Sequence, residues 1–414
     1  MKGFKSLAPV DEAVASFLAK ITHKPSAKRT PLGEALGRYL AEDVTAEVDV
    51  PPFDRAAFDG YAVRSEDTLS ASRANPVVLR LAGRALPGAP YSAELGPGEA
   101  VEVATGAPVP RGADAVVPYE EAEARGEYVE IYRPVPKYYY VSRKGEDVAK
   151  GELVLRAGTR LRPWDIGVLA SLGVREVAVY DVKVALLSTG EELVDLEEAG
   201  SLRPGQIINS SRFVLCGLAQ EAGASCRYLG IYPDDEAAIE EAVARAVEGH
   251  DMVITTGGVS VGEPDRTFKA VAKLAEFAVH GVAVRPGRPN SAAVVGGKPV
   301  VMLSGFPVAA SIGFEIFARP AMLKMVGARE EPRPVVKAVL TRRATTPINV
   351  RTYARVRVFR RGGRLYAEPL AVTGSGVLST LTRGNGILVI PERREGFDEG
   401  EEVEVQLIRP VEDE

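Results

Sequence analysis

The stretch VITTGGVSVGEPD, residues 253–265, is an apolar run that breaks into glycines and ends with two acids around a proline. The apolar run predicts a buried strand, and Pro264 suits the first turn of a helix that would start beside Asp265. The glycines let the backbone adopt positive φ and point N–H groups at an oxyanion. The plainer interpretation is a simple loop followed by an acid that complements the helix dipole.

The surrounding residues, 181–328, alternate apolar strands with amphipathic helices. This alternation predicts a doubly wound α/β domain with a mainly parallel sheet. Within it, LLSTGEE (186–192) leads a second strand into a Ser-Thr-Gly loop. Since open α/β sheets bind ligands at the carboxyl ends of their strands, the two loops are expected to face one crevice.

Helical spacing also occurs at residues 9–21, 30–44 and 163–174. We expect these helices to form one unit, residues 1–47 and 141–180. Short β-branched runs between recurrent Pro and Gly predict a β-rich insert that interrupts it.

The insert spans residues 48–140, and a second β-rich region follows at 329–414. In the latter, a hairpin is expected to turn at Gly362–Gly363, within a small barrel or sandwich. The expected fold class is therefore multidomain, α/β plus β.

Composition restricts the function classes. The chain has 414 residues, a formal net charge of −5 and no apolar run typical of a membrane span or a signal peptide. These values favour a cytoplasmic protein that binds neither nucleic acid nor membrane. Plentiful Arg, Glu and Pro, with few Asn and Gln, favour a thermophilic source.

Cysteine and histidine are scarce. Cys216 and Cys226 are the only cysteines, and the chain has three histidines. The chain therefore offers few cysteine and histidine ligands for a zinc site. Both cysteines are expected to be ordinary core or surface residues, with a Cys–His pair as the open alternative.

Carboxylates recur at expected loop positions. Each has an ordinary interpretation: Asp234 or Asp235 as a helix N-cap, Glu191 as a surface acid, Asp59 as a turn residue. Together they indicate an acidic metal or oxyanion-transfer site. Its members would be Asp59, Asp147, Glu191, Glu192, Asp234, Asp235 and Asp265.

The basic counterpart of these acids is VAVRPGRPN, residues 282–290, where Arg285 and Arg288 flank a Pro-Gly turn. Arginine guanidinium groups at a strand end suit bidentate phosphate binding, but ordinary surface arginines would give the same sequence pattern. The glycines are not followed by Lys-[Ser/Thr] and lack the G-x-G-x-x-G spacing, which disfavours a kinase or a dehydrogenase.

Several motifs in sequence resemble one family. In chain order they are PPFDRAAFDGYAVR, ATGAPVPRGADAVVPYE, RKGEDV, LLSTGEEL, GQIINSS, TTGGVSVGEPD and VRPGRP. From about residue 8 to the C-terminus the chain resembles the MoeA family, molybdopterin molybdenumtransferase, which is related to the C-terminal domain of gephyrin. Two motifs depart from that family: VRPGRP replaces a common KPGKP, and LSGFPV replaces LPGNPV.

The resemblance implies an enzyme that inserts metal from molybdate, or tungstate, into adenylylated molybdopterin and releases AMP. It implies an elongated homodimer with a helical domain I, a β insert, a MogA-like α/β domain and a C-terminal β domain. It also implies a cleft that joins the α/β domain of one subunit to the insert of its partner. The adenylyltransferase and recipient apo-enzymes are possible partners, and an adenylyltransferase or a gephyrin-like scaffold are the alternative functions.

The resemblance also assigns roles to residues of this chain. The expected catalytic residues are Asp59, Thr105, Asp147, Glu192, Asp234 and Asp265. The expected pterin- and phosphate-binding residues are Thr189, Gly190, Gly257, Gly258, Ser260, Gly262, Arg285, Arg288, Ser304 and Pro307. Mg²⁺ is the expected cofactor, held by Asp265, Glu192 and Asp234, and Thr105 and Ser304 are expected to meet the molybdate first.

Overall fold

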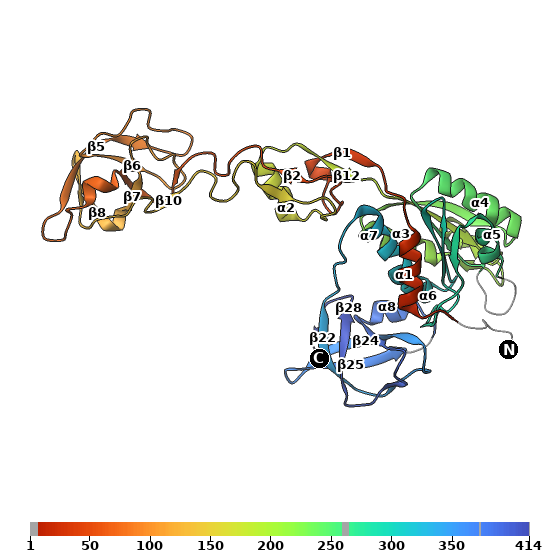
Figure 1. Ribbon diagram of the computed structural model, residues 1–414. Coiled ribbons are helices and arrows are strands. Elements are labelled where there is room, and N and C mark those ends of the chain that lie inside the picture. Colours follow the sequence, from red (N-terminus) through yellow and green to blue (C-terminus); the bar gives the residue numbers. More distant parts are fainter. Residues whose placement is uncertain (1–6, 259–264, 372–373, 414) are drawn as a thin grey trace.

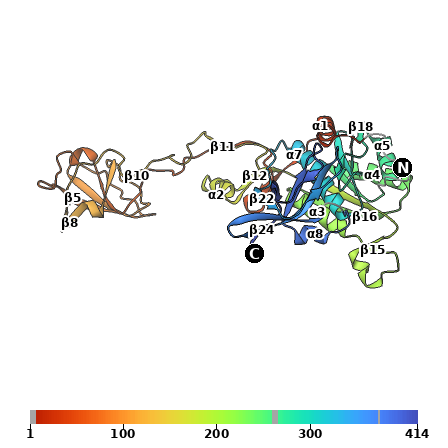
Figure 2. The same ribbon diagram turned by 90° about the horizontal axis from the view of Figure 1, so that it is seen from below.

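The computed structural model describes residues 7–258, 265–371 and 374–413. The protein is elongated (Figure 1): the β-rich insert forms one end, a slender arm connects it to the α/β domain, and the C-terminal domain lies beside the latter. The turned view shows the insert equally separate from the rest (Figure 2).

The α/β domain is built on a six-stranded sheet in the order β16-β13-β17-β21-β20-β18. The first four strands are parallel to one another, and β20 runs antiparallel to its two neighbours, β21 and β18, which confirms a mainly parallel sheet. The strands are β13 (Lys183–Thr189), β16 (Ser225–Tyr232), β17 (Met252–Thr256), β18 (Phe277–Val279), β20 (Ser291–Val295) and β21 (Lys298–Leu303).

Helices cover both faces of this sheet, and each face has its own buried cluster of apolar side chains. Helices α4 (Glu236–Gly249) and α5 (Arg266–Leu274) pack on one face. On the other face lie α1 (Val10–Lys20), α3 (Ser210–Glu221), α6 (Pro307–Gly313), the π-helical turn η5 (Phe314–Ala318) and α7 (Arg319–Val326). A small pair, β14 (Leu193–Val194) and β15 (Ile207–Ile208), with the 3₁₀ turn η4 (Leu196–Ser201), projects beyond β13.

The N-terminal helix belongs to this domain, contrary to the expectation that it forms part of a helical unit with residues 141–180. Phe17 of α1 is fully buried and meets Phe317 edge-on, with ring centroids 5.8 Å apart. The helix predicted over residues 9–21 is therefore confirmed, but its apolar face packs on the α/β domain and not on residues 141–180.

The helix expected over residues 30–44 is wrong. Residues 27–31 form β1 (Ala27–Pro31), which pairs with β12 (Glu176–Tyr180), and only a single 3₁₀ turn, η1 (Leu32–Glu34), follows. Gly37 then takes φ +77°, which interrupts any helix. The unit is thus a mixed arm in which α2 (Pro163–Ser171) is the one helix among the described residues and β2 (Val44–Thr45) pairs with β11 (Leu153–Leu155).

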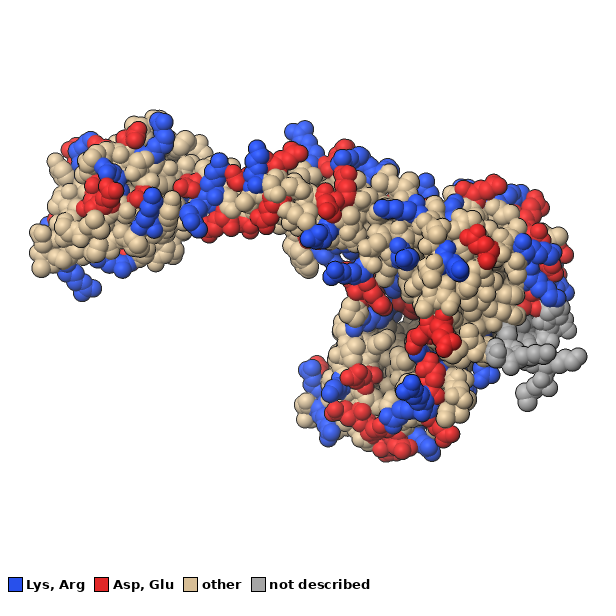
Figure 3. Space-filling model, in the orientation of Figure 1, with Lys and Arg blue, Asp and Glu red and all other residues tan. Residues whose placement is uncertain are grey.

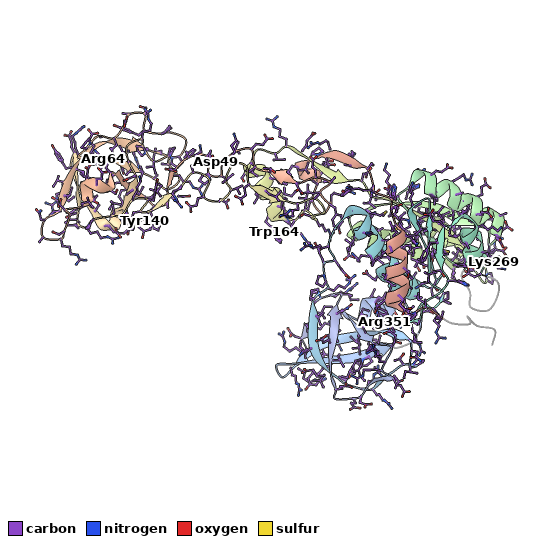
Figure 4. The ribbon with its side chains drawn as sticks, in the orientation of Figure 1. Asp49, Arg64, Tyr140, Trp164, Lys269 and Arg351 are labelled. Carbon is purple, nitrogen blue, oxygen red and sulfur yellow. A yellow bond between two sulfur atoms is a disulfide. The ribbon has the colours of Figure 1, made fainter. Side chains whose placement is uncertain are left out.

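Beyond the arm, the insert forms a six-stranded sheet in the order β7-β4-β6-β5-β9-β8. Its strands are β4 (Gly60–Val63), β5 (Val77–Ala85), β6 (Glu99–Val103), β7 (Ala115–Pro118), β8 (Ala122–Arg125) and β9 (Tyr128–Ile131). A short pair, β3 (Arg55–Ala56) and β10 (Val141–Ser142), lies at its base, and the 3₁₀ turns η2 (Ser65–Thr68) and η3 (Tyr119–Glu121) follow strands. Two chain segments bridged by Val50 and Val148 join the insert to the arm, close to Asp49 in Figure 4.

The C-terminal domain is a closed barrel, because the path of paired strands returns to its start: β24 (Arg351–Arg361), β25 (Arg364–Ala371), β22 (Val335–Leu340), β28 (Glu402–Leu407), β26 (Gly386–Ile390) and again β24. The expected hairpin at Gly362–Gly363 is confirmed. The elements at its periphery are β23 (Ala344–Thr345), β27 (Gly396–Phe397), β29 (Glu412–Asp413) and α8 (Ser379–Arg383). Strand β19 (Val284–Arg285) of the α/β domain pairs with β24 and attaches the barrel.

Cys216 of α3 and Cys226 of β16 form a disulfide. The expectation of ordinary core or surface thiols is therefore wrong, as is the alternative of a Cys–His pair. The reason is tertiary: α3 packs along β16 and brings the two Cα atoms to 5.3 Å, a distance at which disulfides form.

Candidate functional site

The loops singled out in the sequence lie together at the carboxyl edge of the α/β sheet. Strands β13, β17 and β21 are adjacent and parallel, with Ser188 opposite Thr256 and Thr256 opposite Leu303. Their next residues, Thr189 and Gly190, Gly257, and Ser304, therefore follow at one edge. The expectation that the two glycine loops face the same side is confirmed.

The turn at Gly257 and Gly258 brings the backbone very close to β13. A Cβ on Gly257 would lie 1.9 Å from the carbonyl oxygen of Thr189, and both glycines have positive φ. The amide of Gly257 donates to the carbonyl of Leu303 at 3.2 Å, so this N–H is used within the sheet. The glycines here serve close approach, and the expected row of N–H groups for an oxyanion does not include Gly257.

Three side-chain oxygens converge on Gly258. A Cβ there would lie 2.4 Å from Thr267 Oγ1, 2.7 Å from Thr189 Oγ1 and 3.1 Å from Asp234 Oδ1. We call these three oxygens the Gly258 cradle. Only glycine fits this position without displacing them.

Two atoms of the Gly258 cradle lack partners. Thr189 Oγ1 and Asp234 Oδ1 are buried and form no hydrogen bond among the described residues. Thr267 Oγ1 donates to the carbonyl of Gly257 over a long distance, 3.4 Å, and this is its one bond to a described residue. Because a buried polar atom without a partner costs about 1–3 kcal/mol, the cradle is a place where a ligand's polar group would restore lost hydrogen bonds or coordinate.

The choice between Asp234 and Asp235 as helix cap is settled by the backbone. Asp235 is the N-cap of α4 and accepts from the Ala238 amide at 3.0 Å. Asp234 turns Oδ1 to the cradle, while its Oδ2 lies 3.8 Å from Arg266 Nη1. Asp234 is therefore the functional candidate of the pair.

Asp265 is the N-cap of α5 (Arg266–Leu274) and so lies at the helix N-terminus as expected, whereas Pro264, expected in the first turn, lies outside the described residues. Its Oδ1 accepts from the Phe268 amide at 2.8 Å, and its Oδ2 lies 3.1 Å from His280 Nε2. Burial raises the pKa of the Asp265 carboxyl, an effect that the Phe268 amide and His280 oppose and the nearby Asp234 charge reinforces. Asp265 caps the helix, as the plainer interpretation expects, and its carboxylate is also near enough to Asp234 for the two charges to interact.

The loop after β21 completes the edge. Ser304 donates its amide to Asn290 Oδ1 at 2.8 Å and accepts from Thr256 Oγ1 at 3.0 Å, and Pro307 is the first residue of α6. The neighbouring Phe306, a departure from the family motif, is 58% exposed. It therefore presents an aromatic face to solvent at the rim of the site.

Arg285 and Arg288 line a cavity of about 440 Å³ between the α/β domain and the barrel. Gly374 and Ser375 of the barrel form the opposite wall. Asn290 connects this cavity to the sheet edge, because its backbone amide donates to the carbonyl of Gly287, which lines the cavity, at 2.9 Å and its Oδ1 accepts from the Ser304 amide. The arginines thus adjoin the site.

Asp59, Thr105 and Asp147 are not brought to this edge within one chain. Thr105 donates to Asp59 Oδ1 through its amide, at 2.6 Å, and its hydroxyl, at 2.9 Å, which lowers the pKa of Asp59. Both lie on the insert, at the opposite end of the molecule from α5 (Figure 1). Asp147 lies in the connection to the arm, where its amide bonds the carbonyl of Val50.

The proposed metal ligands form no ready-made carboxylate trio: among the described residues, no three His, Cys, Asp or Glu side chains lie close enough to hold a metal ion. Mg²⁺ is commonly bound by one or two carboxylates together with phosphate oxygens and water. Asp234 and Asp265, with the Thr189 hydroxyl, fit that requirement. The Glu192 carboxylate instead lies against the backbone of Gly190: a Cβ added to Gly190 would be 2.8 Å from Glu192 Oε2.

A larger cavity, of about 880 Å³, lies where α1, α7, the arm and the barrel meet. Arg351 there binds Asp11 through both terminal nitrogens, at 2.7 Å each, as Figure 4 places it between barrel and α1. Arg319 and Arg333 pair with Glu315. Because these arginines are neutralised by carboxylates, the cavity is a weaker candidate for an anionic ligand.

Two predicted site residues, Ser260 and Gly262, lie outside the described residues. Sequence reasoning missed Thr267, His280 and Asn209. Asn209 stood in the GQIINSS motif without a role; its amide donates to Ser188 Oγ at 2.8 Å and to the Tyr228 hydroxyl at 3.1 Å. Thr267, two residues after Asp265, could have been found from its place in the first turn of α5, whereas nothing in the sequence marks His280.

Surface features are unremarkable in the face drawn in Figure 3, where acidic and basic side chains alternate over every domain. In the described part of the chain, no helix combines the length and apolar character needed to cross a membrane.

Comparison with family models finds the MoeA N-terminal region (domain I and II) at residues 8–173, a probable molybdopterin binding domain at 185–324 and the MoeA C-terminal region (domain IV) at 337–408. A putative molybdopterin biosynthesis protein of Methanocaldococcus jannaschii is 37% identical over 99% of this chain and 100% of its own. A molybdopterin molybdenumtransferase of Bacillus subtilis is 36% identical over 97% of this chain and 94% of its own.

Among solved structures, a molybdopterin biosynthesis MoeA protein of Pyrococcus horikoshii OT3 matches with a TM-score of 0.83 and 36% identity, over 97% of this chain and 100% of that one. All the domains described above thus have counterparts in one related protein. The chain belongs to the MoeA family.

Proposed function

We propose that this chain is a molybdopterin molybdenumtransferase that inserts metal from molybdate or tungstate into adenylylated molybdopterin and releases AMP. The observation that carries the proposal is the Gly258 cradle beside Asp265 at the carboxyl edge of the sheet, with two oxygens that have no partner in the described part of the chain. The names of the curated relatives support the same activity.

Different residues at the carboxyl edge of the sheet would contact different parts of the substrate. The turn at Gly257 and Gly258 removes side-chain bulk, so that the nucleotide-capped pterin can lie against the strand ends. Arg285 and Arg288 would bind the phosphates or the incoming oxyanion by their guanidinium forks, since the cavity they line adjoins Ser304. The Phe306 ring at the rim would contact the pterin side of the substrate.

Mg²⁺ would be held by Asp234 and Asp265 with the Thr189 hydroxyl, and would supply Lewis-acid polarisation of the phosphoanhydride. Asp265 is kept in place by the start of α5 and by His280. Glu192, whose carboxylate lies against Gly190 in the loop after β13, would bind a displaced proton or water rather than the cation.

Asp59 and Thr105 would act from the partner subunit of a homodimer. The geometry supports this role: the pair is exposed on the insert, next to Phe58, which is 48% exposed, and is remote from the sheet edge of its own chain.

The adenylyltransferase would deliver the substrate, recipient apo-enzymes would take the product, and the reaction would be cytoplasmic.

A mixing experiment tests this arrangement. Asp59→Ala and Asp265→Ala homodimers are each expected to be inactive, but dimers refolded from an equal mixture should recover about a quarter of wild-type AMP release, because half are mixed and each mixed dimer has one intact site. The absence of any recovery would mean that both residues serve one chain or that no such dimer forms.

Two further assays separate the alternative functions. Formation of adenylate from ATP and molybdopterin would favour an adenylyltransferase. Normal cofactor synthesis in cells that carry only Asp265→Ala would favour a scaffold. The proposed function requires that wild-type protein release AMP from adenylylated molybdopterin with Mg²⁺ and molybdate.

A further inference from the structure

His280 contacts Asp265 from outside the motifs that define the site. It lies in the connection between β18 and β19, and its Nε2 is 3.1 Å from Asp265 Oδ2. Because an ionised carboxylate only accepts hydrogen bonds, the imidazole must carry its proton on Nε2 for this bond. His280 therefore donates to the carboxylate proposed to hold the metal.

The imidazole is itself fixed by an aromatic stack. Its ring lies over that of Phe268, with centroids 3.9 Å apart and planes inclined by 17°. Phe268 also donates its amide to Asp265 Oδ1. Phe268 of α5 thus orients Asp265 in two ways: its amide bonds one carboxylate oxygen directly, and its ring holds the histidine that bonds the other.

The consequence for Asp265 is a fixed carboxylate plane. Each oxygen is bonded by a different group, so rotation about the last side-chain torsion would break at least one bond. A carboxylate held on both oxygens presents its remaining lone pairs in a constant direction. Without His280, only the cap bond to Phe268 among these contacts would restrain it.

A second His–carboxylate pair in the same domain shows what such a bond does away from the site. His23 Nε2 lies 2.7 Å from Asp251 Oδ1, and Asp251 Oδ2 accepts from the Lys183 amide at 2.8 Å. Lys183 and Met252 begin β13 and β17, so this pair lies at the amino edge of the sheet. It provides a matched control of the same chemistry.

We propose that His280 is a positioning residue, which holds Asp265 in the orientation that binds the metal during AMP release. The inference rests on the proposed function and adds a residue that the family motifs do not contain. Groups that orient metal ligands from outside typically change metal affinity or activity by about 10–100-fold when removed.

The experiment compares full-length wild-type protein with His280→Ala, His280→Gln and His23→Ala. AMP release is measured against Mg²⁺ and substrate concentration, Mn²⁺ binding is measured by paramagnetic resonance without turnover, and thermal midpoints report folding. His280→Ala should lower kcat and weaken Mn²⁺ binding by about 10–100-fold, with KM for the substrate little changed. His280→Gln, which keeps an N–H donor, should recover most of the loss.

His23→Ala should lower the thermal midpoint and leave kcat and Mn²⁺ affinity unchanged. Equal Mn²⁺ affinity in wild type and His280→Ala would overturn the role of His280, as would a His280→Gln variant no better than His280→Ala. Failure of the wild type to release AMP would instead remove the proposed function, and the Mn²⁺ comparison would still decide whether His280 orients Asp265.

Discussion

The two edges of the α/β sheet differ in how completely the described residues pair their buried polar atoms: Asp265 at the carboxyl edge is bonded on both oxygens, as Asp251 is at the amino edge, but two side-chain oxygens near it are not. At the amino edge, Asp251 is bonded on both oxygens, and Lys298 donates to the carbonyls of Val247 and His250 at the end of α4. At the carboxyl edge, Thr189 Oγ1 and Asp234 Oδ1 are buried and have no hydrogen-bond partner within residues 7–258, 265–371 and 374–413. Hydrogen-bonding capacity that stabilises the fold at one edge is left for a ligand at the other.

Replacing the two capping aspartates should show the largest difference. Asp265→Ala is expected to reduce AMP release about 1000-fold, since loss of a metal-binding carboxylate removes about 4 kcal/mol of transition-state stabilisation. Asp235→Ala removes the same kind of cap from α4. It should cost about 0.5–2 kcal/mol of unfolding free energy and leave kcat unchanged.

Chemical denaturation and AMP-release kinetics on both variants provide the measurement. If Asp235→Ala lost activity to the same extent as Asp265→Ala, the loss would be one of helix capping, and the contrast between the two acids would disappear.

Filling the turn at Gly258 should give the next largest effect. A Cβ at Gly258 would displace the Thr267 and Thr189 hydroxyls, and the residue has φ +63°, which disfavours alanine. Displacement of binding groups by about 1 Å can cost about 100-fold in rate, so Gly258→Ala should lose about that much AMP release. Gly217 lies within α3 with open space around its Cβ position, and Gly217→Ala is the control that should keep full activity.

Local patterns in the sequence predicted most of the carboxyl edge. The apolar run into Gly257 and Gly258, and an acid at the start of the next helix, are properties of consecutive residues, and the structure confirms them. The family resemblance already assigned Asp234 to the site, but local sequence left open which aspartate caps α4, because that depends on a backbone turn that the Asp-Asp dipeptide does not encode. His280 is a tertiary contact, so its relation to Asp265 had no local signal.

The errors in the fold have the same origin. Residues 30–44 have helical spacing, but their backbone pairs with distant segments instead: β1 with β12, Tyr39 with Arg160 and β2 with β11. Helix α1 was recognised from its period, yet its partner, Phe317, lies far along the chain. The disulfide likewise depends on the packing of α3 against β16.

At the amino edge, a mutation should act on stability alone. His23→Ala leaves Asp251 Oδ1 without the partner that it has at 2.7 Å, in a residue that is 9% exposed. Loss of such a bond is expected to cost about 1–3 kcal/mol of unfolding free energy. Denaturant titration measures the loss, and an accompanying fall in kcat would contradict the separation of the two edges.

The smallest effect concerns pH, and it reports on Asp265 directly. Burial raises the pKa of Asp265 in the folded protein above its ordinary value of 3.8. Between the two values the folded state binds more protons than the unfolded state, so this residue's contribution is complete below pH 3.8 and is lost as pH rises through the raised pKa. Asn at this position keeps the cap to Phe268 without titrating.

The unfolding free energy of wild type minus that of Asp265→Asn, measured with a chelator present, should therefore fall with rising pH, by no more than about 1.4 kcal/mol per pH unit. A difference that stayed level or rose would mean that the carboxyl is not destabilised by burial. Saturating Mg²⁺ should oppose the fall above the raised pKa, because a cation that binds the ionised carboxylate only in the folded state stabilises that state. The carboxyl edge would then be stable at neutral pH through its ligand, which the amino edge does not need.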